Sequence, residues 1–254
     1  MKPVLLAGET FLVTSTVAKG YDVGSSASMS NGATRFIEAL DGQGIAVTQI
    51  GGERCETEFP RTVAALQAFS AVVLSDVGAL SLLLTPETRQ GHPGVNRLDL
   101  LRQWVEDGGG LMMAGGYTSF QGMDGMARFH DTPVEECLPV ECAPYPDGLE
   151  APEGLTADVR DTRHPILAGL PRDWPPVLGM NKVTARLATD SEVLAACAYR
   201  GKRHPLLAVR RYGRGRTLAW TTDIGPHWLS RPFLEWSGYD TLMANMVRWV
   251  AQVS

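Results

Sequence analysis

Short runs of consecutive apolar residues recur along the chain and are separated by longer segments with a different pattern. Such runs occur at Val4–Ala7, Ala71–Leu74 and Leu111–Ala114. Uninterrupted apolar runs of this length are typical of strands that are covered on both faces. We therefore expect the strands of a buried sheet at 4–8, 46–50, 71–75 and 111–114, with three more at 193–197, 206–210 and 217–221.

Between these runs, apolar residues recur every three or four positions, which predicts amphipathic helices. In residues 31–41, for example, Phe36, Ile37 and Leu40 share one face. A later helix opens with Asn96 and Asp99, which resemble a capping box. It ends at Gly108, because glycine favours the left-handed backbone conformation that commonly ends a helix. The predicted helices cover about residues 31–41, 61–69, 96–107 and 239–251.

This alternation of strands and helices predicts an α/β fold with a mostly parallel sheet and helices on both faces. The last two strands are joined by Arg211–Arg216, whose two glycines predict an antiparallel hairpin near the C-terminus. Residues 133–176 are rich in Pro, Asp, Glu and Gly and too poor in apolar residues for a core of their own. We interpret them as a peripheral insertion within one domain that spans residues 1–254.

Charge and composition indicate which classes of binding partner are favoured. Formal net charge is -5 and 44% of the residues are hydrophobic, so neither a nucleic acid nor a membrane surface is favoured as a partner. The four cysteines are too few and too irregularly spaced for a disulfide framework. The apolar run at the N-terminus is too short for a signal peptide or a membrane span. We expect a cytoplasmic protein that binds a small polar molecule.

The segment Phe11–Ser30 is long for a loop of a compact domain and consists mostly of small and polar residues. Two functional interpretations are a rim over the site and a subunit contact, and an ordinary surface loop is an equal alternative. The apolar stretch Ala79–Leu84 is a second candidate for a symmetric interface. We therefore expect a homo-oligomer.

The stretch from Gly108 to Gly122 contains a helix stop, a short buried strand, a glycine turn and the start of a new helix. Gly115 and Gly116 allow backbone angles that a side chain would forbid. The turn then presents Tyr117 above the sheet, with the amides of Gly116 and Tyr117 available to an anion. Ser119 is either a nucleophile or, more simply, a cap for the first turn of the helix.

Other polar residues follow the ends of predicted strands. Glu9 and Asp76 follow the first and third strands, at the edge where open α/β sheets bind ligands. His227 follows the last strand, and Asp223 either orients its imidazole or binds an amide of the intervening turn. Two carboxylates near an imidazole can perform acid-base chemistry. Each carboxylate alone is more simply explained by a local hydrogen bond.

Neither a metal site nor a cofactor is expected. The histidines are scattered, and no His-Glu-x-x-His or Cys-x-x-Cys motif occurs. The Gly-x-Gly at Gly213 lies between two strands and opens no helix, so it is not a dinucleotide fingerprint. Trp220, Trp228 and Trp236 either form a wall on which a sugar stacks or pack in the core.

Three motifs resemble a known family. They are Gly-Gly-Tyr-Thr-Ser-Phe-Gln-Gly at 115–122, His-Pro-Ile-Leu-Ala-Gly-Leu-Pro at 164–171, and the segment from Tyr212 to Trp228. These motifs are similar to those of putative glutamine amidotransferases in the class I glutamine amidotransferase-like superfamily. That group lies near the trehalose-utilisation-type proteins and the trimerisation domain of some β-galactosidases. The resemblance runs over nearly the whole chain.

The resemblance implies a flavodoxin-like three-layer fold with a nucleophile elbow after a central strand. Amidotransferases place a cysteine in that Gly-x-Cys-x-Gly turn and pair it with a distant His and Glu. Here Tyr117 occupies the cysteine position and His227 resembles the base, while the acidic residue expected two positions later is absent. A phenol with a pKa near about 10 is harder to ionise than a thiol near about 8.5. The usual thioester route of glutamine hydrolysis is therefore not expected.

Two functions remain open at this point. One is a pseudoenzyme that keeps the amidotransferase scaffold, lacks the nucleophile and binds a small polar or sugar-like ligand at the carboxyl edge of the sheet. Its ligand-binding candidates are Glu9, Asp76, Gly115, Gly116 and Ser119. The alternative is a hydrolase or transferase that acts on an amide or a sugar-derived substrate. In that case Tyr117, Asp223 and His227 are the catalytic candidates, with His227 as base.

Overall fold

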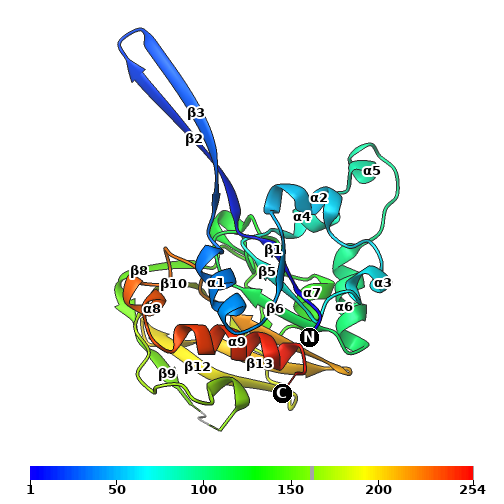
Figure 1. Ribbon diagram of the computed structural model, residues 1–254, viewed down its shortest axis with the longest axis vertical. Coiled ribbons are helices and arrows are strands. Elements are labelled where there is room, and N and C mark those ends of the chain that lie inside the picture. The colour runs from blue at the N-terminus through cyan, green and yellow to red at the C-terminus, as the bar shows by residue number, and fades with distance from the viewer. Residues whose placement is uncertain (161–162, 254) are drawn as a thin grey trace.

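An eight-stranded sheet with helices on both faces organises the computed structural model, which describes residues 1–160 and 163–253 (Figure 1). Five neighbouring strands are parallel. Numbered in chain order, they lie across the sheet as 2-1-3-4-5, as in flavodoxin. Three antiparallel strands extend the sheet at one side. Across the sheet the order is β4 (Val47–Ile50), β1 (Val4–Gly8), β5 (Ala71–Ser75), β6 (Gly110–Ala114), β14 (Gly215–Trp220), β13 (Lys202–Tyr212), β12 (Ser191–Tyr199) and β9 (Ala157–Val159).

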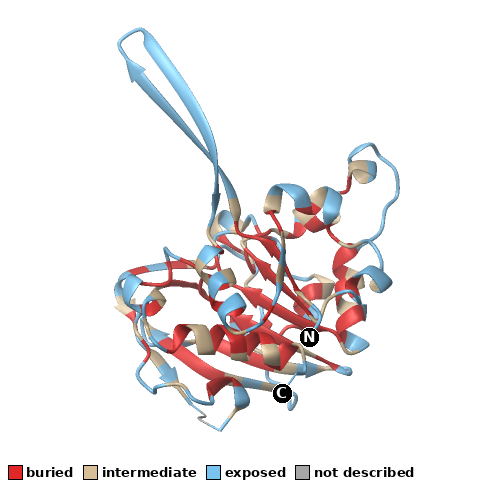
Figure 2. Ribbon diagram, in the orientation of Figure 1, coloured by how far each residue is buried: buried red, intermediate tan, exposed pale blue. Residues whose placement is uncertain are grey.

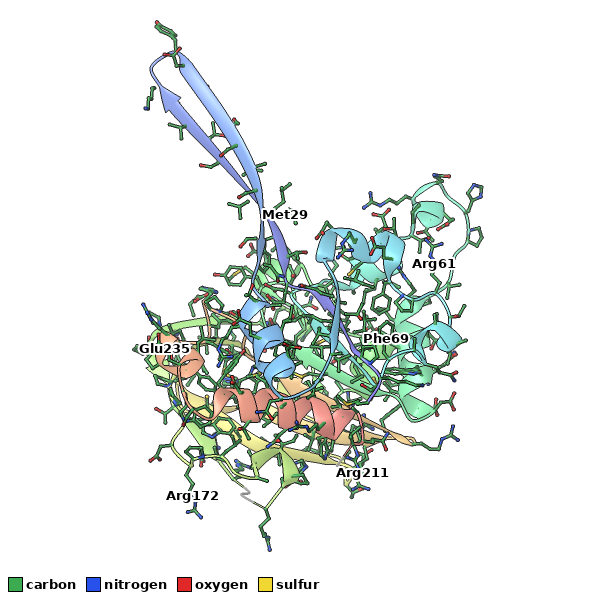
Figure 3. All side chains as sticks on the ribbon, in the orientation of Figure 1. Met29, Arg61, Phe69, Arg172, Arg211 and Glu235 are labelled. Carbon is green, nitrogen blue, oxygen red and sulfur yellow. The ribbon has the colours of Figure 1, made fainter. Side chains whose placement is uncertain are left out.

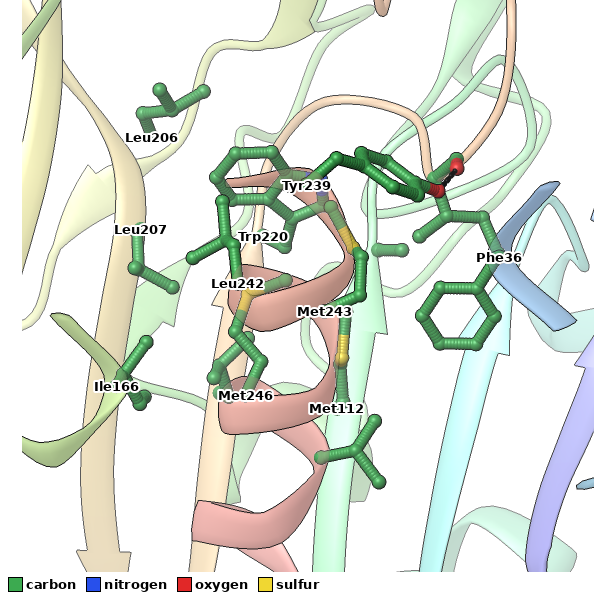
Figure 4. Close-up of a cluster of buried hydrophobic side chains, with 14 of the residues drawn as sticks. Phe36, Met112, Ile166, Leu206, Leu207, Trp220, Tyr239, Leu242, Met243 and Met246 are labelled. Carbon is green, nitrogen blue, oxygen red and sulfur yellow. Dashed lines mark hydrogen bonds between the residues drawn. The ribbon is translucent and has the colours of Figure 1, made fainter. Parts of the chain in front are cut away.

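The central strands are buried along their full length, because helices cover both faces (Figure 2). One core contains α1 (Thr34–Gly42) and α9 (Tyr239–Val250), whose Phe36, Met243 and Met246 belong to the same buried cluster as Trp220 (Figure 4). The other core lies beneath a second group of helices. These are α2 (Cys55–Glu58), α3 (Val63–Leu66), α4 (Ala79–Leu83), α6 (Arg97–Glu106) and α7 (Pro133–Cys137).

The predicted parallel sheet and the C-terminal hairpin β13–β14 are confirmed. Asn96 caps α6 as expected, since its side chain accepts the amides of Leu98 and Asp99. The helix predicted over 61–69 is shorter than expected. Thr62 caps it, and the chain leaves the helical path after Leu66 because the Ser70 amide bonds to the carbonyl of Pro3 beside β1.

The segment Phe11–Ser30 is a long β-hairpin rather than a loop. Its strands β2 (Thr10–Lys19) and β3 (Asp22–Asn31) pair with each other in register along their whole length. The hairpin stands between β1 and α1 and projects away from the rest of the molecule (Figure 1).

No helix follows the turn at Gly115 and Gly116, so that prediction was wrong. The buried Asp147 carboxylate accepts the amides of Gln121 and Gly122, and Gly122 has a φ of 80°. These amides are thereby withdrawn from any helix, and only the short 3-10 turn η2 (Met123–Gly125) forms. Ser119, expected to cap the helix, instead accepts a hydrogen bond from the backbone amide of Asp76 (3.1 Å).

The segment 133–176 contributes α7 to the core on one face of the main sheet and β9 to one edge of that sheet. Besides α7 and β9 it contains the longer strand β8 (Gly148–Leu155), which pairs with β10 (Val177–Asn181). No helix in the described part of the chain is long and apolar enough to cross a membrane. The remaining elements are η1 (Gly52–Arg54), α5 (Pro86–Arg89), β7 (Val140–Glu141), η3 (Pro165–Leu167), β11 (Thr184–Ala185) and α8 (Arg231–Leu234).

Candidate functional site

Four parallel strands deliver polar side chains to one edge of the sheet. Glu9 follows β1, Asp76 follows β5, Tyr117 follows β6 by three residues, and the loop after β14 carries Asp223 and His227. This is the carboxyl edge, where the strand ends leave room for a ligand. The structure brings together residues that lie more than 200 positions apart in the sequence.

Three solvent-facing groups form an upper layer of this site. The Tyr117 hydroxyl donates to Glu150 Oε1 at 2.9 Å and lies 3.4 Å from His227 Nε2. His227 Nε2 is in turn 3.6 Å from Glu150 Oε2. The His227 side chain is 52% exposed and that of Glu150 45%, so this layer is open to solvent.

Three further carboxyl groups lie beneath this layer: Glu9, Asp76 and Asp223. Burial, together with the nearby Asp76 charge, raises the pKa of Glu9 to about 8. Burial also raises the pKa of Asp223 to about 9, and the nearby carboxyls of Glu9 and Asp76 add to the shift. Both groups therefore carry a proton at neutral pH. The pKa of Asp76 is also raised by burial, although hydrogen bonds from Thr118 oppose the shift.

Asp223 forms a hydrogen bond with the backbone rather than with the imidazole of His227. Its Oδ2 accepts the Trp228 amide at 2.8 Å but lies 3.8 Å from His227 Nδ1, beyond hydrogen-bond range. As a neutral acid at pH 7, it also supplies no negative charge to stabilise a protonated His227. The pair is thus adjacent but lacks the geometry of a catalytic Asp–His dyad.

Several site residues have backbone angles that are unusual for residues with side chains. The φ angles are 60° at Glu9, 46° at Asp76 and 103° at His227. Such conformations cost on the order of 1–3 kcal/mol each and tend to cluster where function requires them. Two of these residues directly follow strands, and the third lies in the loop after β14. The unusual angles thus occur together at one edge of the sheet, as they do in ligand sites.

The turn after β6 is held by a buried polar frame. Asn181 Oδ1 accepts the Gly116 amide at 3.0 Å, and Asn181 Nδ2 donates to Asp147 and to the carbonyls of Gly116 and Ser119. Gly115 is equally constrained, because a Cβ there would lie 2.4 Å from the Thr221 carbonyl oxygen. The Gly116 amide, expected to bind an anion, is therefore already occupied.

The backbone amide of Thr118, the residue after the elbow position, also has a hydrogen-bond partner within the chain. Asp76 Oδ1 accepts hydrogen bonds from the Thr118 backbone amide at 2.7 Å and from the Thr118 hydroxyl at 3.2 Å. In nucleophile-elbow enzymes, the amide that follows the nucleophile stabilises the oxyanion. Here a carboxyl group fills that place.

The three tryptophans considered as a sugar-stacking wall have different roles. Trp220 and Trp228 are fully buried, and Trp220 packs with Trp174 and Phe233. The half-buried Trp236 packs with the same two rings. Trp228 Nε1 donates to Glu150 Oε1 at 2.9 Å, and its ring lies 5.7 Å from that of Tyr117. Trp228 thus supports the site from below and presents no face to solvent.

Among the described residues, no three His, Cys, Asp or Glu side chains are grouped as a metal site requires. A cavity of about 760 Å³ lies elsewhere, lined by Arg211, Arg216, Arg248 and Trp249. It does not include Tyr117, Glu150 or His227. The candidate site at the carboxyl edge is therefore separate from this cavity.

Three site residues were missed in the sequence: Asp147, Glu150 and Asn181. Asp147 and Glu150 lie in the segment 133–176, where weak periodicity gave no element on which to place them. Glu150 belongs to β8 and Asn181 to β10, the strands that pair beside the elbow. Asn181 is the polar residue of the mostly buried strand β10, whereas Glu150 is exposed on the alternating strand β8. Their nearness to the elbow becomes visible only once β8 and β10 are known to pair.

The flavodoxin-like sheet and the glycine elbow after β6 define a class I glutamine amidotransferase-like protein. The model of the GATase1_like family, described as "Putative glutamine amidotransferase", matches residues 3–252. The chain therefore belongs to that family.

Two solved structures from Salmonella typhimurium are similar to the whole chain. Cytoplasmic protein STM3548 is 32% identical, with a TM-score of 0.90 over 98% of this chain and 98% of that chain. Cytoplasmic protein STM1381 from strain LT2 is 33% identical, with a TM-score of 0.89 over 98% of this chain and 99% of that chain. No curated protein matches this chain.

A more distant likeness extends to a much larger enzyme. The cold-adapted β-galactosidase from Rahnella sp. R3 is 15% identical, with a TM-score of 0.51 over 86% of this chain and 26% of that chain. This similarity concerns the fold alone.

Proposed function

We propose that the protein binds a small, uncharged polar ligand, such as a polyol or sugar, at the carboxyl edge and does not hydrolyse glutamine. The observation that carries the proposal is the elbow itself. Tyr117 stands at the nucleophile position, and Asp76 occupies the Thr118 amide that an oxyanion would need. The protein is then a pseudoenzyme with respect to glutaminase chemistry.

The charge of the site supports a neutral ligand. Glu150 presents a half-exposed carboxylate, and Asp76 lies beneath it. Carboxylates repel an anionic ligand such as a sugar acid and accept hydrogen bonds from hydroxyl groups. Protonated Glu9 and Asp223 add neutral polar groups below. A polyol matches this arrangement of acceptors better than a phosphate or a carboxylate does.

Tyr117 is not activated as a nucleophile. Partial burial and the hydrogen bond to Glu150 raise its pKa to about 12. A phenol with this pKa stays protonated at neutral pH, where it acts as a hydrogen-bond donor. Tyr117 therefore suits the orientation of a ligand better than attack on one.

The test is a thermal-shift screen with sorbitol, glucose, glutamine and gluconate, repeated with His227→Ala and Tyr117→Phe. We expect stabilisation by at least one neutral polyol or sugar and its loss in His227→Ala, because binding to the folded state alone raises Tm. Glu38→Gln, on the outer face of α1, is the matched control. The proposal fails if none of the neutral compounds stabilises the protein or if purified protein releases ammonia from glutamine.

One observation favours a second function, that of a hydrolase or transferase with His227 as base. His227 Nε2 faces solvent within 3.6 Å of Glu150, and its backbone is strained. A solvent-facing imidazole beside a carboxylate can abstract a proton from a bound hydroxyl or water. This function would appear as turnover of a stabilising ligand that is lost in both His227→Ala and Glu150→Gln.

We further propose that the protein is cytoplasmic, as both Salmonella relatives are described to be. All four cysteines are buried and free, which suits a reducing compartment. The fold and the polar site call for no resident cofactor in this proposal.

A further inference from the structure

We propose that the β2–β3 hairpin is an arm through which the chain binds a second copy of itself. The arm, defined as residues 10–31, pairs with no other strand among the described residues. Every residue of its two strands is exposed except Thr10, which is half-buried (Figures 1 and 2). Its side chains extend into solvent on both sides of the ribbon (Figure 3).

The arm has the composition of a contact surface rather than of a solvated hairpin. Its charged residues are Lys19 and Asp22, which pair across the turn at the tip. The strands below the tip have no charge, although Leu12, Val23 and Met29 are each more than half exposed. Exposed strands of soluble proteins normally carry charges or prolines that prevent association. Here these protective residues are absent.

Both faces of the ribbon suit close packing. On one face Leu12 pairs with Met29, and Ala18 with Val23. On the other face Val13 and Val17 lie opposite Ser28 and Gly24. Most of these side chains are small, so each face is thin and nearly flat. Both outer edges also leave backbone groups available for pairing with another strand.

The arm needs a contact with another surface to be stable. A lone two-stranded ribbon is marginally stable in water, and the body of the same chain does not cover it (Figure 1). Ten residues per strand span about 33 Å, and two strands are about 10 Å wide. The two faces thus offer on the order of 700 Å². This approaches the roughly 800 Å² per partner of a stable protein complex.

A second copy is the occupant that this geometry favours. In a two-fold pair each chain gives one arm and receives one, so the buried area doubles without any further surface. The arm has no net charge, because Lys19 and Asp22 balance each other at the tip. It therefore offers little attraction to nucleic acid or to an acidic partner. When two copies exchange identical arms, the arm of each copy is buried against the other copy.

The arm is joined directly to the candidate site. β2 starts at the residue after Glu9, and the Gly32 amide at the end of β3 donates to the Glu9 carbonyl at 2.9 Å. The Gly32 carbonyl packs so tightly on Gly225 that a Cβ on Gly225 would lie 2.2 Å from its oxygen. Gly225 lies in the loop that carries Asp223 and His227. Arm docking therefore fixes the backbone on two sides of the site.

The experiment measures mass by light scattering at several concentrations, without ligand. We expect the 27.5 kDa chain to form at least a dimer. A variant that joins Phe11 to Ser30 through an Asn-Gly turn lacks the contact and should be monomeric. The double variant Leu12→Asp/Met29→Asp, which places two charges on one face, should dissociate without shortening the chain. Leu187→Asp, fully exposed on the body, is the matched control and should keep the wild-type mass.

Folding of each variant is checked by the near-ultraviolet circular dichroism of the buried Trp220 and Trp228. Hydrogen exchange adds a local readout. Amides on the outer edges of the arm should be protected in the wild type and exchange rapidly in the double variant. The proposal is overturned if the wild type is monomeric at every concentration, or if the double variant folds and keeps the wild-type mass. Mass and exchange are both measured without ligand, so these results are read independently of the proposed ligand binding.

Discussion

Asp76 and Thr118 are joined by two hydrogen bonds, from the backbone amide and from the hydroxyl of Thr118 to the same carboxyl oxygen. This pair connects the end of β5 to the turn after β6. It stands where an amidotransferase needs a free amide for the oxyanion. Under the proposed function, the chain lacks both the thiol and this free amide, so we expect that restoring the thiol alone is insufficient.

Tyr117→Cys should therefore not produce a glutaminase. Position 117 is 38% exposed, so the new thiol should react with iodoacetamide. Ammonia release from glutamine should nevertheless stay at the background level of Tyr117→Ser, since each missing oxyanion donor costs about 10²–10³-fold in rate. Ammonia release well above that background would show that the Thr118 amide becomes available.

The site lowers stability at high pH. The pKa values of Glu9 and Asp223 are raised to about 8 and 9 by burial, so the folded chain holds protons that the unfolded chain loses near pH 4. The contribution is complete below pH 4 and is lost as the pH rises through 8 and 9. The free energy of unfolding should fall over this window by on the order of a few kcal/mol, which lowers the urea midpoint.

The variant Glu9→Gln tests the contribution of Glu9 to this loss of stability at high pH. The amide resembles the protonated acid and does not titrate, so the variant should be more stable than the wild type at pH 9 and similar at pH 5. Glu38→Gln, on the exposed face of α1, should leave the pH profile unchanged. If Glu9→Gln and the wild type lose stability equally between pH 5 and pH 9, Glu9 is not protonated in the folded chain.

Much of the fold could be predicted because its signals are local. The buried runs of β1, β5 and β6 and the periodic α6 and α9 each indicate their own structure. The approach of Tyr117 to His227, with ring centroids 5.1 Å apart, agrees with the prediction that both lie at the carboxyl edge. That prediction rested on strand ends and on the family resemblance, which together placed both residues there.

The rest depended on contacts between distant segments. The helix expected after Gly116 is replaced by turns because Asp147, 31 residues from Gly116, accepts the amides it needs. Glu150 and Asn181 act only through the β8–β10 pairing. The arm had a local signal, since β-branched residues in Thr10–Val17 precede a Lys-Gly-Tyr-Asp turn. It was missed because its strands have no polar and apolar faces.

Gly116→Ala should destabilise the protein strongly. Gly116 has a φ of 144°, and an added Cβ would lie 2.4 Å from Asp76 Oδ1. The unfavourable angle and the clash together should cost at least about 2 kcal/mol. The measurement is the urea midpoint, with Gly42→Ala as control because a Cβ on Gly42 meets nothing within 4 Å. Equal midpoints for the two variants would contradict the tight contact between Gly116 and Asp76.

Asn181→Ala should loosen the elbow. It leaves the Gly116 amide and the Asp147 carboxyl without their buried partner, at a cost of about 2–4 kcal/mol. Asn245→Ala also removes two hydrogen bonds to backbone carbonyls, but at a partly exposed place away from the site. It should cost about 1 kcal/mol. A smaller loss in Asn181→Ala than in Asn245→Ala would contradict the proposed frame.

Glu150 should determine which ligands are excluded. Its carboxylate is held by Tyr117 and Trp228 at 2.9 Å each, so it keeps its place and repels a ligand of like charge. We expect sorbitol to stabilise the wild type more than gluconate does, and Glu150→Gln to reduce this preference several-fold by removing the repulsion.

Tm shifts over a concentration series of each compound measure the preference. Glu235→Gln, at a carboxylate that directly follows α8 and pairs with Arg231, is the control. A wild type that favours gluconate, or a Glu150→Gln variant with an unchanged preference, would mean that Glu150 does not set the charge of the site.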